Sequence, residues 1–165
     1  MKTWGSTARR SSWSGTFNFY TADDRFTNLI KHPEKFLDTG CHYAIEPNFS
    51  TSSEMDFFWN FAAIYWKRRI ARFWQDHQVL LFVDLYVSPQ YRDLNLLSVP
   101  KGWTAYANRA LRTQSDHLLD DYALACNHAG TDAILYLVFG GGPAAAALCK
   151  THQWLWIENQ RSPLT

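Results

Sequence analysis

The sequence predicts an α/β fold: a single domain with a mainly parallel sheet built from βα units, as an open sheet or an incomplete barrel. Short apolar runs of strand length alternate with segments of helical periodicity between residues 16 and 158, which is the pattern of βα units. Residues 79–87, VLLFVDLYV, form a nearly continuous apolar strand, as expected where both faces of a sheet are covered. A chain of 165 residues has the length of one domain.

The N-terminal end has a different composition from the rest of the chain. Residues 1–16 are rich in Ser, Gly and Arg and lack periodicity, so we expect a flexible basic arm followed by the α/β domain over residues 17–165. The first expected elements of the domain are a strand, a short broken helix that ends at Gly40, and a second strand, over residues 16–20, 24–40 and 41–46.

Residues 51–78 are the longest helical candidate. A capping box fits Ser53 with Asp56 three residues later. Apolar side chains recur at steps of three and four, the period of one helix face; they are Met55, Phe58, Trp59, Ala62, Trp66, Ile70, Phe73 and Trp74.

The C-terminal half continues the alternation of strands and helices. A weaker strand, a helix that ends at Gly130, a buried strand, a helix with Pro143 in its first turn and a final strand are expected over residues 103–107, 115–130, 132–139, 140–150 and 154–158. Parallel βα units therefore account for the whole domain.

Composition and charge limit the classes of function. With 47% hydrophobic and 19% charged residues, the chain has the composition of a folded globular protein. A net charge of +1 argues against DNA binding by bulk charge, although the arm and the 67–72 stretch are locally basic. Eight tryptophans predict an aromatic core, and leave open that some rings line a ligand or base-stacking surface.

Several classes of site have no signature here. Three cysteines without CxxC spacing predict neither a disulfide framework nor a zinc site, and the histidines and serines show no HExxH or GxSxG pattern. The first twenty residues lack the apolar core of a signal peptide, and no apolar run approaches about 18 residues. We expect a cytoplasmic protein without a membrane partner; its oligomeric state is left open.

Acidic residues fall at the predicted carboxyl ends of the strands, where sites collect in parallel α/β architectures. Asp24 follows the first expected strand, Glu46 ends the next, and Asp84 lies near the end of the 79–87 strand. These three are the candidate catalytic residues and the candidate ligands of a metal, with Mg²⁺ the cofactor candidate. The alternative is that they pair with arginines, and one of Arg68, Arg69 and Arg72 is expected to turn inward for this purpose.

The candidate contacts to phosphate are basic residues and a glycine-rich turn. The turn follows a predicted strand and opens a helix, but it matches neither GxGxxG nor the P-loop pattern. Lys101 lies in a Pro/Gly turn, where an ordinary surface lysine is the alternative. The complete set of nucleic-acid or phosphate-binding candidates is Arg9, Arg10, Lys101, Arg109, Gly140, Gly141 and Gly142.

The segments FYTADDRF, EPNFS, YWKRRIARFWQ, FVDLYV, LLSVPKGW and VFGGG, in this order, resemble a family of bacteria, plasmids and phages catalogued as domain of unknown function 4417. The resemblance covers about residues 17–158. Asn48 departs from the PDFS pattern of many members, which places a carboxylate role at that position in doubt. The resemblance implies an α/β domain and a mobile-element context, and it implies no activity.

Three hypotheses of function remain. The leading one is action on DNA or RNA in a plasmid, phage or other mobile element, with replication-associated, metal-dependent phosphodiester chemistry as one form of it. The second is an enzyme that acts on a phosphorylated or sugar-like small molecule, with Glu46 and Asp84 as acid and base. The third is a non-enzymatic phage or host interaction protein whose carboxylates form ion pairs with arginines. An open basic groove would favour nucleic acid, and a closed acidic cup would favour a metabolite. The sequence leaves open whether the protein is an enzyme.

Overall fold

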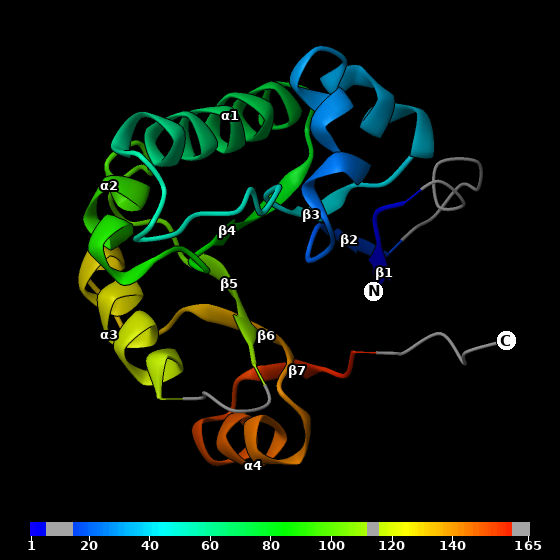
Figure 1. The fold of residues 1–165 in the computed structure, drawn as a ribbon. Helices are drawn as coiled ribbons and strands as arrows, with labels where there is room; N and C mark the ends of the chain where they lie inside the picture. The colour runs from blue at the N-terminus through cyan, green and yellow to red at the C-terminus, as the bar shows by residue number, and fades with distance from the viewer. Residues whose placement is uncertain (6–14, 112–115, 160–165) are drawn as a thin grey trace, which may run out of the picture. The chain divides into compact units, whose positions relative to one another are not determined.

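The computed structural model describes residues 1–5, 15–111 and 116–159 (Figure 1). The chain divides into two compact units, residues 1–99 and 100–165, which are described one at a time. Every strand pairing described in either unit is parallel, and helices alternate with the strands, so the predicted α/β class with parallel βα units is confirmed.

The first unit contains four parallel strands in chain order: β1 (Lys2–Thr3), β2 (Thr16–Asn18), β3 (Tyr43–Ile45) and β4 (Leu80–Asp84). The register aligns Phe17 with Ala44, and Ile45 with Phe82. Strand β1 lies inside the segment that was expected to be a flexible arm. Lys2 and Thr3 pair with β2, and the next residue, Trp4, is buried.

Three short 3-10 helices connect β2 to β3: η2 (Asp23–Arg25), η3 (Thr27–Ile30) and η4 (Pro33–Thr39). The expected broken helix is thus three separate turns. Gly40 ends η4 with a φ of 67°, in the left-handed region that glycine adopts most readily. The predicted stop at Gly40 is therefore confirmed.

The long helix α1 (Phe57–Asp76) begins later than expected, and Asp56 is its N-cap, accepting a hydrogen bond from the Phe58 amide at 2.8 Å. The predicted capping box at Ser53 is wrong. Helix α1 packs against β4 and η4 (Figure 1). Its buried face consists of Asn60, Ile64, Lys67, Ile70, Ala71 and Trp74.

This buried face differs from the apolar face that the sequence predicts. Ile70 and Trp74 belong to both faces. Toward the N-terminus of α1, however, the positions buried at intervals of three and four residues are Lys67, Ile64 and Asn60. Met55, Phe58 and Trp59, expected on the same face, are exposed.

The core of the first unit is a cluster of aromatic rings. Phe36 and Trp74 are closest, with ring centroids 4.3 Å apart, and Trp4 stacks on Phe19 at 5.5 Å. Phe17 contacts Trp4 edge to face. For these rings, the expectation of an aromatic core is confirmed.

After β4 the chain forms η5 (Pro89–Tyr91) and the short helix α2 (Arg92–Leu96), neither of which the sequence predicts. The two lie directly after the candidate residue Asp84. They therefore shape the surroundings of the carboxyl end of β4, on the side of α1, with which α2 is in contact.

The second unit has three parallel strands, with β6 (Leu135–Gly140) paired to both β5 (Ala105–Ala110) and β7 (Leu155–Ile157). Helices α3 (His117–Ala129) and α4 (Gly142–His152) connect them. Strand β5 is longer than expected. Asn108 and Arg109 therefore lie within β5, whereas the strand predicted over residues 103–107 would end before them. Across the described residues, no helix combines the length and apolar character needed to span a bilayer.

Candidate functional site

Glu46 and Asp84 meet at the carboxyl ends of β3 and β4. Parallel pairing aligns Ile45 with Phe82, and the Glu46 amide continues it by donating to the Phe82 carbonyl at 3.1 Å. The Glu46 carboxylate then accepts a hydrogen bond from the Asp84 amide, at 3.0 Å from Oε2. Glu46 and Asp84 therefore lie beside each other, as parallel pairing of β3 and β4 requires, while their roles as catalytic residues or metal ligands stay predictions.

Asp84 is completely buried, and both of its carboxylate oxygens accept hydrogen bonds from protein donors. Oδ1 accepts from the Tyr20 hydroxyl at 2.9 Å and the Tyr86 amide at 3.2 Å. Oδ2 accepts from the Asn48 side-chain amide at 2.8 Å and from Lys67 Nζ at 2.9 Å. The carboxylate is thus held by four donors, one of which is the Lys67 ammonium.

Lys67 is the partner of Asp84 that the sequence analysis missed. It is buried on the inner face of α1 and also donates to the Asp84 carbonyl at 3.0 Å. Burial lowers the pKa of the Lys67 ammonium, and the charge of Asp84 opposes that lowering. Its position three residues after Ile64 and seven before Trp74 was the available signal, because that spacing places it on the buried face.

Glu46 is paired with Arg68, whose Nη1 donates to the Glu46 carboxylate. The Nη2 of Arg68 donates to both oxygens of Asn95, the carbonyl and the side-chain amide. Asn95 in turn donates from Nδ2 to the Asp84 carbonyl at 3.0 Å. The prediction that one arginine of the basic stretch turns inward is confirmed for Arg68.

Asp24 makes none of the hydrogen bonds that hold the Glu46 and Asp84 carboxylates. It is exposed on η2, and the carboxylate of its neighbour Asp23 accepts hydrogen bonds from the Ser50 amide and hydroxyl at 3.0 and 3.1 Å. Within residues 1–5, 15–111 and 116–159, no three His, Cys, Asp or Glu side chains are grouped closely enough to hold a metal ion.

The candidate phosphate contacts are spread over several elements. Lys101 is exposed in the turn that begins the second unit. Arg109 is partly buried within β5, and its carbonyl lies 3.0 Å from Nε2 of His117. Arg9 and Arg10 lie outside the described residues.

The glycine-rich turn has a packing reason for two of its glycines. Gly140, Gly141 and Gly142 all have positive φ, at 83°, 78° and 68°. A Cβ on Gly141 would stand 2.4 Å from the Cβ of Ala110, and one on Gly140 would stand 3.2 Å from the Ala110 carbonyl oxygen. Close approach of α4 and β5 therefore requires glycine there, whatever else the turn does.

The outward face of α1 carries aromatic residues where a surface helix normally has polar ones. Phe58 is 75% exposed and Trp59 is 74% exposed, and Tyr65 is also exposed. Farther along the same face are the guanidinium groups of Arg69 and Arg72. Large aromatic side chains exposed together in this way are uncommon on a protein surface.

The two arginines of this face are tethered at its edge. Arg69 donates to the Ile30 carbonyl at 2.8 Å and lies over the Trp66 ring, and Arg72 forms an exposed ion pair with Asp76 at 3.3 Å. We call the set Phe58, Trp59, Tyr65, Arg69 and Arg72 the α1 outer face.

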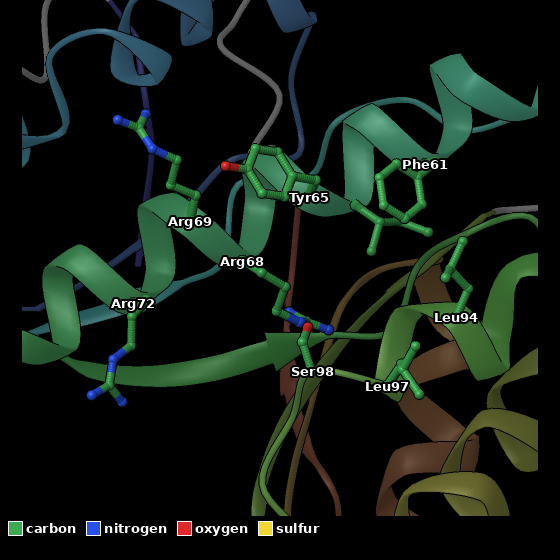
Figure 2. Close-up of a pocket in the computed structure, with 9 residues that line it drawn as sticks. Phe61, Tyr65, Arg68, Arg69, Arg72, Leu94, Leu97 and Ser98 are labelled. Carbon is green, nitrogen blue, oxygen red and sulfur yellow. The ribbon is translucent and has the colours of Figure 1, made fainter.

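A groove of about 530 Å³ runs beside α1. One wall is formed by Phe61, Ile64 and Tyr65 of α1, and the other by Leu94, Leu97 and Ser98. Figure 2 shows Arg68 extending from α1 toward Ser98, whereas Arg69 and Arg72 point away from it. The described residues that line the groove include these three arginines and no acidic side chain.

The architecture and site define an α/β protein with a buried ion-pair network beneath a basic and aromatic surface. A family model described as a domain of unknown function, DUF4417, matches residues 3–110. The chain belongs to this family, and the match includes β2 to β5, the ion-pair network and the groove. No curated protein and no solved structure matches the chain.

Proposed function

We propose that the protein binds single-stranded nucleic acid along the α1 outer face. The observation that carries the proposal is that aromatic rings and arginines lie together on the exposed side of α1. They lie beside a groove whose described lining residues include no acidic side chain. Proteins that bind single strands combine these two elements, because bases stack on the rings while cations contact the phosphates.

The spacing of the face supports an extended ligand. Phe58, Tyr65 and Arg72 are seven residues apart, and seven residues make almost two helical turns, so the three side chains lie on one side of α1. With a rise of about 1.5 Å per residue, they extend over about 21 Å of helix. That length accommodates several nucleotides of an unpaired strand.

The local charge supports an anionic ligand. The whole chain has a net charge of +1, so attraction to a polyanion depends on where the cations lie. Arg69 and Arg72 are both exposed on α1, and the only ion pair of Arg72 among the described residues is the exposed, weak one with Asp76, whereas Arg68 and Lys67 are held in buried pairs with Glu46 and Asp84. Two phosphate contacts are therefore expected from this face.

The proposal assigns binding to α1 and assigns no bond-breaking step to Glu46 or Asp84. Both acids are buried and ion-paired, so they support the helix that carries the binding face. We extend the proposal to the setting that the family resemblance implies, in which the ligand is a strand exposed during plasmid or phage replication.

Fluorescence anisotropy with a labelled ten-nucleotide thymidine oligonucleotide tests the proposal. The affinity is expected to fall with salt at a logarithmic slope of about −1.4, from about −0.7 for each of two phosphate contacts to a single strand. Arg72→Gln is expected to reduce the slope by about 0.7. Trp59→Ala is expected to weaken binding by about 1–3 kcal/mol, the usual contribution of one stacked base.

Lys150→Gln is the matched control, since it removes one exposed positive charge from α4 and leaves α1 intact. It is expected to leave the salt slope unchanged. Absence of any affinity for DNA or RNA at low salt would refute the proposal. Equal affinity for polyglutamate would also refute it, since that would make the face a site for acidic protein segments.

A further inference from the structure

We infer that the groove beside α1 is a docking site for a short amphipathic helix of a partner protein, one that carries acidic side chains beside an apolar face. The inference goes beyond the proposed function and does not depend on it. The groove, at about 530 Å³, lies within the range of about 300–1,000 Å³ typical of ligand sites. Both of its walls belong to the first unit, so its shape is set within one compact part of the chain.

The walls of the groove are mainly apolar. Phe61, Ile64 and Tyr65 contribute side chains from α1, and Leu94 and Leu97 contribute side chains from the opposite wall (Figure 2). Leu97 is 81% exposed and Phe61 is 47% exposed, although both are large and apolar. Apolar side chains of a partner placed between them would remove both surfaces from water, which favours docking.

The backbone of the walls favours a helical partner over an extended one. One wall is the helix α1, whose backbone groups are bonded within the helix. In the other wall, the Leu97 amide donates to the Leu94 carbonyl, and the Val99 amide donates to the Leu96 carbonyl. An extended peptide would lose its hydrogen bonds to water without gaining a strand partner, whereas a helix satisfies its own backbone.

The length of the groove suits a helix of about three turns. The lining residues of α1 extend from Phe61 to Arg72. At a rise of about 1.5 Å per residue, these positions cover about 16 Å of α1. On a partner helix of this length, apolar residues at positions i, i+4 and i+7 lie on one face. We therefore expect three apolar anchors in the groove.

The charges at the rim favour acidic side chains beside those anchors. Arg69 donates to a neutral acceptor, the Ile30 carbonyl, so this contact does not neutralise its charge. Arg72 is paired with Asp76, but both side chains are more than half exposed, and ion pairs of this kind are weak. No acidic residue is among the described residues that line the groove. The complement of this surface is an apolar segment with negative charge.

Arg68 connects the two walls before a partner binds. Its Nη2 donates from α1 to both oxygens of Asn95 on α2, and its Nη1 donates to Glu46. The charge of Arg68 is thus used inside the protein, and the spacing of the walls is set in advance, which lowers the cost of docking. Carboxylates of the partner are therefore expected at Arg69 and Arg72, which lie about one helical turn apart.

The groove overlaps the α1 outer face at Tyr65, Arg69 and Arg72. An acidic helix in the groove and a strand on the outer face would need the same arginines, so each is expected to displace the other. Leu94 and Leu97 line the groove and are not part of the α1 outer face. Changes at Leu97 therefore distinguish the two ligands.

Fluorescence anisotropy with labelled synthetic peptides tests the inference. The probes are fourteen-residue peptides of alanine and glutamate with apolar anchors at positions 4, 8 and 11, made in four versions with leucine, isoleucine, methionine or phenylalanine as the anchor. At least one version is expected to bind the wild-type protein at micromolar concentrations. Placing the same anchors around the whole helix, or replacing glutamate by lysine, is expected to weaken binding at least about tenfold.

Leu97→Ala is expected to weaken binding of the best peptide about tenfold, because it removes apolar surface that the peptide covers. Leu119→Ala is the matched control, since Leu119 is an exposed leucine on α3 of the second unit, and it should leave the affinity unchanged. Arg72→Gln is expected to weaken binding about threefold and to reduce its salt dependence. Unchanged peptide affinity in Leu97→Ala overturns the inference.

Other occupants of the groove would give different results. The inference is overturned if none of the four peptides binds at micromolar concentrations. It is also overturned if sedimentation velocity shows a dimer that Leu97→Ala dissociates, because a second copy of the chain would then fill the groove. Vesicles of phosphatidylserine that bind the wild type but not Leu97→Ala would make the groove a lipid site and overturn it as well.

The oligonucleotide provides the last comparison. Leu97→Ala is expected to bind the ten-nucleotide thymidine oligonucleotide as tightly as the wild type does. A loss equal to the loss of peptide affinity would assign the groove to the strand and overturn the inference. Peptide binding by a protein that fails to bind the oligonucleotide at low salt would refute the proposed function and leave this inference standing.

Discussion

Replacing Lys67 by methionine is expected to destabilise the protein strongly, although the two side chains are similar in length. The Lys67 ammonium donates to Oδ2 of Asp84 at 2.9 Å and to the Asp84 carbonyl at 3.0 Å, and both residues are almost fully buried. Methionine removes the cation and leaves the Asp84 carboxylate in the interior. Removing one partner of a buried ion pair typically costs about 3–5 kcal/mol.

Other contacts determine where in this range the cost falls. Asp84 keeps hydrogen bonds from Tyr20, Asn48 and the Tyr86 amide, so its oxygens retain donors but lose the compensating charge. We therefore expect a loss of about 3 kcal/mol in the free energy of unfolding. At an m-value of about 2 kcal/mol/M, the urea midpoint should fall by about 1.5 M.

Urea unfolding of four proteins measures the pair directly: wild type, Lys67→Met, Asp84→Asn and the double variant. The double variant is expected to be more stable than the sum of the single losses predicts, by about 2 kcal/mol, because it leaves no unpaired buried charge. Arg72→Met is the control on the same helix, since its exposed ion pair with Asp76 contributes less than about 1 kcal/mol. The reasoning is refuted if Lys67→Met changes stability no more than Arg72→Met, or if the losses of the single variants simply add.

Three further changes test other parts of the account by denaturant unfolding. Gly141→Ala should lower the free energy of unfolding by about 2–5 kcal/mol, because its Cβ would stand 2.4 Å from that of Ala110 and its φ is positive. Gly142→Ala should lower it by only about 1–2 kcal/mol, since a Cβ there meets no described atom within 4 Å. Similar losses for the two variants would contradict the packing argument. Asp56→Ala should cost about 1 kcal/mol by removing the N-cap of α1, and an unchanged midpoint would show that the cap contributes nothing. Burial raises the pKa of the Cys149 thiol from 9.0 to about 11, so the stability that the buried neutral thiol contributes is complete below pH 9 and is lost as the pH rises toward 11. The Cys149→Ala variant should therefore lose less stability than the wild type between pH 9 and 11. Parallel pH profiles of the two proteins would contradict this expectation.

The alternation of strands and helices is predictable from local patterns because each strand is short, apolar and bounded by turn residues. The runs around Ala44, Val83 and Val138 were long enough to identify, and the glycines at 40 and 130 ended their helices as expected. Strand β1 was missed because a strand of two residues carries no periodicity. Only its pairing with β2 and the burial of Trp4 define it.

The site was predictable in part. The convergence of Glu46 and Asp84 follows from parallel pairing, and the spacing of the basic residues indicated that one arginine would turn inward. The burial of Lys67 was harder to predict, since a lysine between two aromatic stretches of an amphipathic helix normally faces water. Its place on the inner face depends on a carboxylate from β4, a contact between residues 17 positions apart.

The aromatic surface of α1 reversed the usual rule that apolar side chains mark the buried face. Phe58 and Trp59 had the correct period for a core face, yet the helix turns them outward because Asn60 and Lys67 are required inside. Asn60 accepts from the Ser52 amide at 2.9 Å and donates to the Tyr91 hydroxyl at 3.2 Å, which fixes the rotation of the first turns. Long-range polar contacts of this kind are not visible in a periodic pattern.

The central claim, that a single strand lies along α1, is tested most directly by photocrosslinking. A thymidine oligonucleotide that contains 5-iodouracil is irradiated with the wild-type protein, and the crosslinked peptides are identified by mass spectrometry. The account predicts crosslinks to the aromatic residues of α1, at Phe58, Trp59, Phe61 or Tyr65. Crosslinks confined to residues 100–103 or to the turn at residues 140–142, with none on α1, would contradict it.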